Sequence, residues 1–443
     1  MDKRVLISTV DCWNDKIGAN TFSRLLERYD TSLVANLYIR EEIPNSSTCR
    51  RYFKISESSV VRSVFHRGIK TGKLLSGSDL APDLEDAANL AKTKARYSHY
   101  GGRRSVIMLM AREMAWRLGR WKTRELDGFL DDFSPEVIMF PLEGYMHFNR
   151  INRYMARRTR AKVIGYFWDD NFTYNLPSKS FGHRMLRFFQ RRSVKKTVKC
   201  CDAFFAISPK MKRECDAVFG IESVVLTKPI DLGHGQWTPY TPQHPIRMLY
   251  AGNLAIGRMN TLQILAQAIS KINRQGDRLV LDVYTKTEIS AHQAAALGSF
   301  VHVHEAVSEE AVLDLQQQAD ILLFVEDILG EGRKKARLSF STKLTDYFKA
   351  GKCIFAIGCA DIAPMEYLME NDAACCATSQ EELDAKLSAL VDDLDMICAY
   401  GEKAFALGSK NHSREKIQQT FYHTISSLFE KDVAYVAESC ADQ

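Results

Sequence analysis

The sequence lacks the long hydrophobic run that a membrane-spanning helix requires. No apolar stretch approaches the roughly 20 residues that such a helix needs. The longest candidate, Val106–Leu118, is interrupted by Arg112, Glu113 and Arg117. The N-terminal segment also lacks the hydrophobic region of a signal peptide, because Asp11 ends its short apolar run. We therefore expect a cytoplasmic protein.

The sequence also lacks the motifs of a metal or cofactor site. Its 11 cysteines form no CxxC pair, and the sequence has no Walker A or GxGxxG motif. The only DxD, Asp393–Asp395, follows a predicted helix and is expected to be a solvated surface rather than a Mg²⁺ site. His302 and His304 share one face of a strand without a third ligand. We expect reduced thiols, no metal and no cofactor.

Positive charge is present, and it is concentrated in one part of the chain. Residues 150–199 contain 14 lysines and arginines but only two acids, Asp169 and Asp170, whereas the whole chain has a net charge of +6. One basic surface predicts an anionic partner. Nucleic acid is not expected, because no RNA- or DNA-binding motif accompanies the charge.

Apolar strands alternate with helices along the C-terminal half. This alternation predicts a parallel sheet that is covered on both faces, as in a doubly wound domain. The predicted strands are 246–251, 279–284, 300–303, 320–325, 353–357 and 373–376, and the predicted helices are 261–272, 287–297, 309–318, 342–349 and 381–390.

The N-terminal half follows the same α/β pattern. The predicted strands are 4–10, 32–38, 136–140, 162–167, 203–207 and 223–226, the predicted helices are 18–28, 105–130 and 179–199, and residues 41–104 are left unassigned. Four prolines and two glycines in 228–245 indicate a linker. We expect an N-terminal acceptor-binding domain (1–228), a linker (229–245), a nucleotide-sugar-binding domain (246–412), and a C-terminal helix (413–443) that packs back on the first domain and ends in a loose tail.

The segment 339–358 combines features of a diphosphate site. Ser341, Thr342 and Lys343 lie where a helix begins, so free N–H groups, the helix dipole and an ammonium converge there. Asp346 lies one turn further on and can accept hydrogen bonds from a ribose diol. The alternative is an ordinary capped helix with Ser341 or Thr342 as N-cap.

These motifs resemble those of the family 4 glycosyltransferases, which have the two-domain GT-B fold. The matching segments are AGNLAIGR (251–258), STKLTDYFKAGKCIFA (341–356) and CCDAFFAISPKM (200–211). The resemblance implies two Rossmann-like domains that face a central cleft. It also implies that Gly252, Asn253, Arg258 and Lys343 bind the donor diphosphate and that Asp346 binds the ribose.

The sequence departs from the family pattern at the donor sugar. The family has two glutamates eight positions apart, but Leu338 lies eight positions before Asp346, which is itself an aspartate. Glu326 is the nearest replacement for the first glutamate, with Glu331 as its rival. Residues 328–339 then form an insertion, which is either a basic flap over the diphosphate or a solvated loop.

Acidic residues follow several strands of the N-terminal half. Asp169 and Asp170 follow strand 162–167, Asp11 follows the first strand with Gly18 nearby, and Glu143 follows strand 136–140. Acids at the carboxyl ends of strands can orient or deprotonate an acceptor hydroxyl. We assign that role to Asp170. The alternative is that Asp170 only caps its own turn.

Together these features predict a glycosyltransferase. It is expected to move a sugar, with retention of configuration and without a metal, from a nucleotide diphospho-sugar to a lipid-linked or polysaccharide intermediate of surface glycan synthesis. The alternatives are a nucleotide-sugar epimerase on the same fold and a non-catalytic polyanion-binding scaffold.

Residues 179–199 predict peripheral binding to an anionic membrane surface. Phe181, Met185, Phe188 and Phe189 recur at helical spacing among many basic residues, and the segment contains no acid. The alternative is that this apolar stripe packs on the sheet of its own domain and that the charges are solvated.

Overall fold

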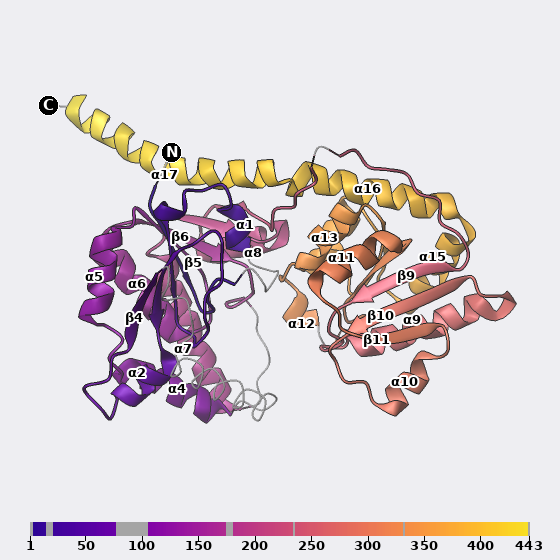
Figure 1. Cartoon of the computed structure of the whole chain (residues 1–443), viewed down its shortest axis with the longest axis horizontal. Coiled ribbons are helices and arrows are strands. Elements are labelled where there is room, and N and C mark those ends of the chain that lie inside the picture. Colours follow the sequence, from indigo (N-terminus) through magenta and orange to yellow (C-terminus); the bar gives the residue numbers. More distant parts are fainter. Residues whose placement is uncertain are drawn as a thin grey trace. The chain divides into compact units, whose positions relative to one another are not determined.

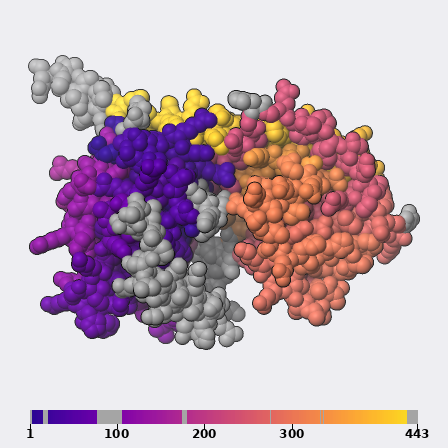
Figure 2. All heavy atoms as spheres, in the orientation of Figure 1, coloured from indigo at the N-terminus to yellow at the C-terminus, as the bar shows by residue number. Residues whose placement is uncertain are grey.

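The computed structural model describes residues 3–14, 21–76, 105–173, 180–233, 235–330 and 333–441, and the other residues are grey in Figure 1 and Figure 2. The chain divides into two compact units, which we describe separately. Unit 1 comprises Met1–Ile207, Lys212–Leu226 and Gln418–Gln443, and unit 2 comprises Ser208–Met211 and Thr227–Ile417.

Unit 1 is built on an eight-stranded sheet with the order β4-β3-β2-β1-β5-β6-β7-β8. Neighbouring strands are parallel except β4, which is antiparallel to β3. The strands are β1 (Val5–Thr9), β2 (Val34–Tyr38), β3 (Arg51–Ile55), β4 (Gly72–Ser76), β5 (Val137–Pro141), β6 (Lys162–Phe167), β7 (Ala203–Ala206) and β8 (Ser223–Val225).

The central strands of unit 1 are buried on both faces. Every residue of β1, β2 and β5 is buried, which explains why these strands read as continuous apolar runs in the sequence. The six strands that the sequence predicts for this half are present, and β3 and β4 lie in the segment that it leaves unassigned.

Helices of unit 1 flank this sheet (Figure 1). α4, α6 and α7 pack against one another, and α2 packs on α4. The helices are α1 (Thr21–Leu25), α2 (Glu57–Ser63), α4 (Val106–Leu118), α5 (Arg124–Phe133), α6 (Met146–Thr159) and α7 (Phe181–Val198), and α8 (Pro209–Phe219) follows β7 along the chain.

The single helix predicted for residues 105–130 is wrong, because the chain forms α4 and α5 there. The Gly119 N–H donates to the Ala115 carbonyl at 2.7 Å, and a Cβ at Gly119 would lie 2.5 Å from the Val60 carbonyl oxygen. α5 then starts afresh, because the Thr123 side chain accepts a hydrogen bond from the Leu126 N–H at 3.2 Å. This break creates the segment 119–123 between the two helices.

Unit 2 contains a six-stranded parallel sheet with the order β11-β10-β9-β12-β13-β14. All six strands predicted from the sequence are present, with ends shifted by at most two residues. The strands are β9 (Ile246–Ala251), β10 (Leu279–Thr285), β11 (Val301–Glu305), β12 (Ile321–Val325), β13 (Cys353–Ile357) and β14 (Cys375–Ala377). β10 and β11 lie on one side of β9 in the sheet, and β12, β13 and β14 lie on the other. The position between β9 and β12 is therefore the switch point of a doubly wound sheet.

The helices of unit 2 pack on this sheet through a continuous apolar core. They are α9 (Arg258–Ile272), α10 (Ala291–Leu297), α11 (Glu309–Gln318), α12 (Arg333–Ala336), α13 (Thr342–Ala350), α14 (Ala363–Glu370), α15 (Gln380–Asp392) and α16 (Leu394–His412). Asp393 caps α16, because its carboxylate accepts from the N–H groups of Asp395 and Met396, both at 3.1 Å.

The last helix, α17 (Arg414–Ala441), starts in unit 2 and continues in unit 1. Within unit 1 the Phe421 ring stacks on Phe205 at 5.9 Å, and the Tyr422 ring stacks on Tyr29 at 6.0 Å. The Gln418 side chain donates to the Arg24 carbonyl at 3.2 Å. The part of α17 that follows Ile417 therefore packs on unit 1 through Gln418, Phe421 and Tyr422.

Candidate active site

The carboxyl ends of β9 and β12 carry the residues expected to bind a donor in unit 2. Gly252 directly follows β9, and Glu326 directly follows β12. These strands flank the switch point, where loops from neighbouring strands diverge and leave room for a ligand. The Glu326 side chain is only 7 % exposed.

Lys343 extends from the first turn of α13 toward the end of β9. Its Nζ lies 4.6 Å from the centroid of the Tyr250 ring. A Cβ built on Gly252 would lie 1.7 Å from that nitrogen, so the ammonium occupies the space that any other residue would fill. The Ser341 side chain makes no capping hydrogen bond, so it does not occupy the N–H groups of the first turn of α13.

The Lys343 ammonium has no carboxylate partner among the described residues. Burial, helped by the nearby positive charge of Arg258, lowers the pKa of Lys343 to about 8. Desolvation and a neighbouring like charge both disfavour the ammonium, and a bound anion would reverse both effects. The position therefore has the electrostatics of an anion site.

Arg258 is held between β9 and β12. Its guanidinium donates to both carboxylate oxygens of Glu326, at 2.7 and 3.2 Å, and to the Asn253 side-chain oxygen at 2.7 Å. Burial disfavours its charge, but the contact with Glu326 outweighs burial and raises the pKa of Arg258. Glu326 thus holds the Arg258 guanidinium in position.

Asp346 has a partner that the sequence analysis missed. Its two carboxylate oxygens accept from the Lys228 ammonium at 2.9 and 3.2 Å, and the Lys228 side chain is only 3 % exposed. The sequence analysis places Lys228 at the start of the linker. Its position two residues after the predicted strand 223–226 is the one signal that points to a role in a site.

In unit 1 the carboxyl end of β5 carries a half-buried glutamate. Glu143 accepts a hydrogen bond from the Trp168 indole N–H at 3.0 Å. Burial raises the pKa of Glu143 to about 7, and the negative charges of Asp169 and Asp11 contribute to this increase. A carboxyl group with this pKa can donate or accept a proton near neutral pH.

Asp170 contacts the residues of its own turn. One carboxylate oxygen accepts from the N–H groups of Phe172 and Thr173, at 3.1 and 2.7 Å, and the other accepts from the Thr173 hydroxyl. Asp11 forms an ion pair with Arg40 at 2.5 Å. The contacts of Asp170 in this structure are thus those of a turn cap.

Solved structures with the same architecture span nearly the whole chain. A structure of HepE from Anabaena in complex with UDP aligns with a TM-score of 0.60 and 10 % identity, over 96 % of this chain and 100 % of that one. An α,α-trehalose-6-phosphate synthase from Burkholderia multivorans aligns with a TM-score of 0.59 and 9 % identity, over 99 % of each chain. The sucrose-phosphate synthase of Thermosynechococcus elongatus aligns with a TM-score of 0.59 and 11 % identity, over 97 % and 100 %.

The fold is GT-B. Both units are Rossmann-like, and the expected fold class is confirmed. A scan against protein-family models gives no match, and a search of curated protein sequences gives none either. At about 10 % identity the solved structures establish the shared fold, and the roles of individual residues rest on the contacts in this chain.

The structure describes the remaining residues of the site predictions only in part. Gly18 and Glu331 lie outside the described residues. Leu338 is fully buried in the position where the family pattern has a glutamate. In the segment 328–339, Arg333 starts the short helix α12 and forms an ion pair with Asp361. The described part of this segment therefore contacts the rest of unit 2 through this ion pair.

Neither a metal cluster nor a membrane-spanning helix is found in the described parts of the GT-B fold. No group of three or more histidines, cysteines or acids is arranged to hold a metal ion there. Within the same residues, no helix is both long and apolar enough to cross a bilayer. His302 and His304 both approach Asp282, at 3.5 and 2.8 Å.

Proposed function

We propose that this protein is a glycosyltransferase that moves a sugar from a nucleotide diphospho-sugar to an acceptor hydroxyl. The observation that carries the proposal is the Lys343 ammonium, which lies beside Gly252 and close to Arg258 without a carboxylate partner among the described residues. Two cations and the N-terminus of α13 lie around the switch point, where a GT-B fold has space for a ligand.

The two cations would act on the leaving diphosphate. As the bond to the sugar breaks, negative charge builds on the diphosphate, and Lys343 and Arg258 stabilise that charge. Both groups are already in place before the reaction, so little reorganisation is needed at the transition state. Glu326 has two roles in this proposal, because it positions Arg258 through its carboxylate and lies next to the site of the donor sugar.

Asp346 and Lys228 would form the nucleoside end of the donor site. A carboxylate can accept hydrogen bonds from both hydroxyls of a ribose. Lys228 holds that carboxylate through two contacts at 2.9 and 3.2 Å. Ser341, Thr342 and Asn253 complete the donor side, the first two as part of the helix start and the third through its contact with Arg258.

Glu143 is our candidate for the group that handles the acceptor hydroxyl. It lies at the switch point of unit 1, and its pKa of about 7 allows it to accept the hydroxyl proton or to hold the hydroxyl by a hydrogen bond. We prefer Glu143 to Asp170, whose oxygens are occupied by its own turn. Asp11 and Asp169 remain acceptor-side candidates, since their charges act on Glu143.

The solved neighbours support the class of donor. One is a complex with UDP, and others are sugar-phosphate synthases by name, which favours a nucleotide-sugar donor and a glycan acceptor. A lipid-linked or polysaccharide acceptor and retention of configuration belong to the proposal through the family 4 resemblance. The anomeric configuration of the product, measured by NMR, tests retention.

We also propose that the enzyme is cytoplasmic and docks on anionic membranes through α7. This helix packs through Leu186, Val194 and Val198, while Phe181 and Phe188 are 70 % and 57 % exposed. The apolar stripe that could have packed on the sheet is therefore mostly solvent-exposed. Exposed aromatic side chains among basic residues favour an interfacial helix beside anionic lipid.

One experiment separates this function from its alternatives. Nucleotide sugars are first screened by thermal shift, because a donor at about 100 times its Kd adds roughly 2.7 kcal/mol of stability. Release of the nucleoside diphosphate is then measured with and without acceptor glycans. Acceptor-dependent release supports a transferase, interconversion of sugars without acceptor indicates an epimerase, and the absence of any nucleotide binding indicates a scaffold.

A further inference from the structure

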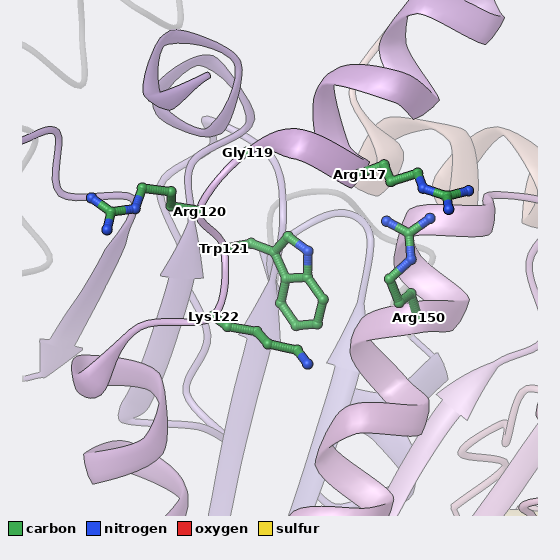
Figure 3. A pocket seen from close by; sticks show the side chains of 6 residues that line it. All are labelled: Arg117, Gly119, Arg120, Trp121, Lys122 and Arg150. Atoms are coloured by element: carbon green, nitrogen blue, oxygen red, sulfur yellow. The ribbon is translucent and has the colours of Figure 1, made fainter. Parts of the chain in front are cut away.

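Unit 1 contains a basic cavity at the C-terminal end of α4. The cavity has a volume of about 350 Å³ and lies between the end of α4, the segment that connects α4 to α5, and α6 (Figure 3). No acid lines it. The lining residues are Arg117, Gly119, Arg120, Trp121, Lys122 and Arg150. None of them belongs to the donor or acceptor residues described above.

Three of the four cations lie around the Trp121 side chain. The guanidinium groups of Arg117 and Arg150 point toward one another (Figure 3), and the Lys122 ammonium lies over the Trp121 ring, 5.4 Å from its centroid. Arg120 extends away from them, and its guanidinium donates to the Arg67 carbonyl at 2.5 Å. The cavity therefore receives positive charge from Arg117, Arg150 and Lys122.

This charge is not neutralised by the described part of the chain. None of the three cations forms an ion pair with a described carboxylate. Glu113 acts on Arg150 electrostatically, but its oxygens accept from the N–H groups of Met146 and His147, at 3.0 and 2.9 Å. Burial lowers the pKa of Arg150, and the charge of Arg117 lowers it further against the opposing effect of Glu113. An anion between the two guanidinium groups would relieve their repulsion.

The Trp121 indole adds a hydrogen-bond donor to the cavity. Its side chain is only 5 % exposed, and its N–H lies on the edge that faces Arg117 and Arg150 (Figure 3). No described residue accepts a hydrogen bond from that N–H. The N–H is therefore available to an acceptor that enters the cavity.

We propose that this cavity, the Trp121 pocket, binds the phosphate group of a phosphorylated small molecule or of a phospholipid headgroup. Guanidinium groups bind phosphate oxygens in pairs, and the indole N–H can contact a further oxygen, while the Lys122 ammonium adds positive charge from the other side of the indole. The volume suits a headgroup or a sugar phosphate. The pocket lies within unit 1, so the proposal does not depend on a donor site in unit 2.

The test follows the indole N–H resonance of Trp121 by NMR in the full-length protein. Trp121→Phe identifies the resonance, because it removes the N–H and keeps an aromatic ring. Glycerol 3-phosphate and inorganic pyrophosphate should shift this resonance saturably. Arg117→Gln and Arg150→Gln should each weaken the apparent affinity about tenfold or more, because a charge-assisted hydrogen bond is lost. Arg157→Gln, which removes a charge further along α6, should leave the affinity unchanged.

A second arm separates the two sources of the phosphate. Vesicles of phosphatidylcholine with and without phosphatidic acid are added in place of the soluble probes. A shift with glycerol 3-phosphate supports a soluble ligand, and a shift only with phosphatidic acid vesicles supports a lipid headgroup. The proposal is overturned if no probe shifts the resonance, or if the arginine variants respond like Arg157→Gln. An inactive donor site would not alter either result.

Discussion

Lys343 is the residue whose protonation state should control donor binding. Its pKa of about 8 means that it loses its charge at a lower pH than an ordinary lysine. Because a bound diphosphate favours the ammonium, we expect UDP affinity to be steady below about pH 8 and to fall above it. Lys343→Arg should retain affinity at about pH 9.5, since arginine stays charged there.

Calorimetry of UDP binding at several pH values measures this dependence. Lys343→Ala should lower affinity roughly tenfold or more near neutral pH, as expected for loss of a charge-assisted contact. Lys349→Ala, on the exposed side of the same helix, is the matched control. A pH-independent affinity in the unchanged protein would contradict the role of Lys343.

Gly252 should matter for binding rather than for stability. An added methyl group would lie 1.7 Å from the Lys343 Nζ, but that nitrogen is the far end of a flexible side chain and can move. Gly252→Ala should therefore displace the ammonium, weaken UDP binding at least severalfold, and change the unfolding free energy by less than about 1 kcal/mol. A urea titration beside the binding assay checks both parts. Normal affinity in Gly252→Ala would show that the ammonium is not needed in its observed position.

Glu143 should give the transfer reaction its pH dependence. The carboxylate form that can accept a proton is populated above a pKa of about 7, so kcat/KM should rise as pH passes through that value. Glu143→Gln keeps an acceptor for the Trp168 N–H, and it should remove this rise and lower the rate roughly 10²–10⁴-fold. UDP affinity, a property of unit 2, should stay the same. If Asp170→Asn keeps the pH dependence of kcat/KM, the choice of Glu143 is supported.

At the scale of elements, the end of α16 is held by a histidine that is neutral in the folded chain. The His412 ring nitrogens hydrogen-bond the Thr227 hydroxyl at 2.8 Å and the Tyr367 hydroxyl at 2.9 Å. Burial, with a contribution from Lys416, lowers the pKa of His412 to about 4. The unfolded chain takes up this proton near pH 6.5, so the folded state loses stability as pH falls from about 6.5 toward about 4.

Urea unfolding at about pH 7 and about pH 5 measures this loss. The pKa difference predicts that His412 contributes roughly 2 kcal/mol to the decrease over this range. His412→Gln should reduce the pH dependence, whereas His423→Gln, an exposed histidine on α17, should leave it unchanged. An equal pH dependence in both variants would mean that His412 does not stay neutral in the fold.

At the scale of the whole molecule, the exposed face of α7 should determine where the protein works. Co-sedimentation with anionic and neutral vesicles should show binding that requires anionic lipid and weakens with salt. Replacing Arg192, Lys196 and Lys199 by Gln should reduce binding. Replacing Arg274, Lys286 and Lys349 in unit 2 removes the same charge and should leave binding intact. No binding to anionic vesicles at low salt would rule out this docking surface.

The fold could be predicted from the sequence because its signals are local. Buried parallel strands are continuous apolar runs, and helices repeat their apolar residues at fixed spacing, so the strands of unit 2 could be read directly. The helix predicted for residues 105–130 failed where α4 ends at Gly119 and the Thr123 side chain caps a new helix, α5. The close fit of Gly119 against the Val60 carbonyl, which is distant along the chain, is seen only in the structure.

The amino-acid sequence alone predicts the α/β pattern of both halves, the positions of the strands along unit 2, and the helix start at Ser341 that points to a diphosphate. Only the tertiary structure paired Asp346 with Lys228, assigned Asp170 to its own turn, and gave Glu143 its raised pKa. It alone assembled the Trp121 pocket from α4 and α6. The physical reason is that pairing, burial and pKa depend on neighbours that are distant along the chain, whereas strand and helix patterns depend on residues that are close.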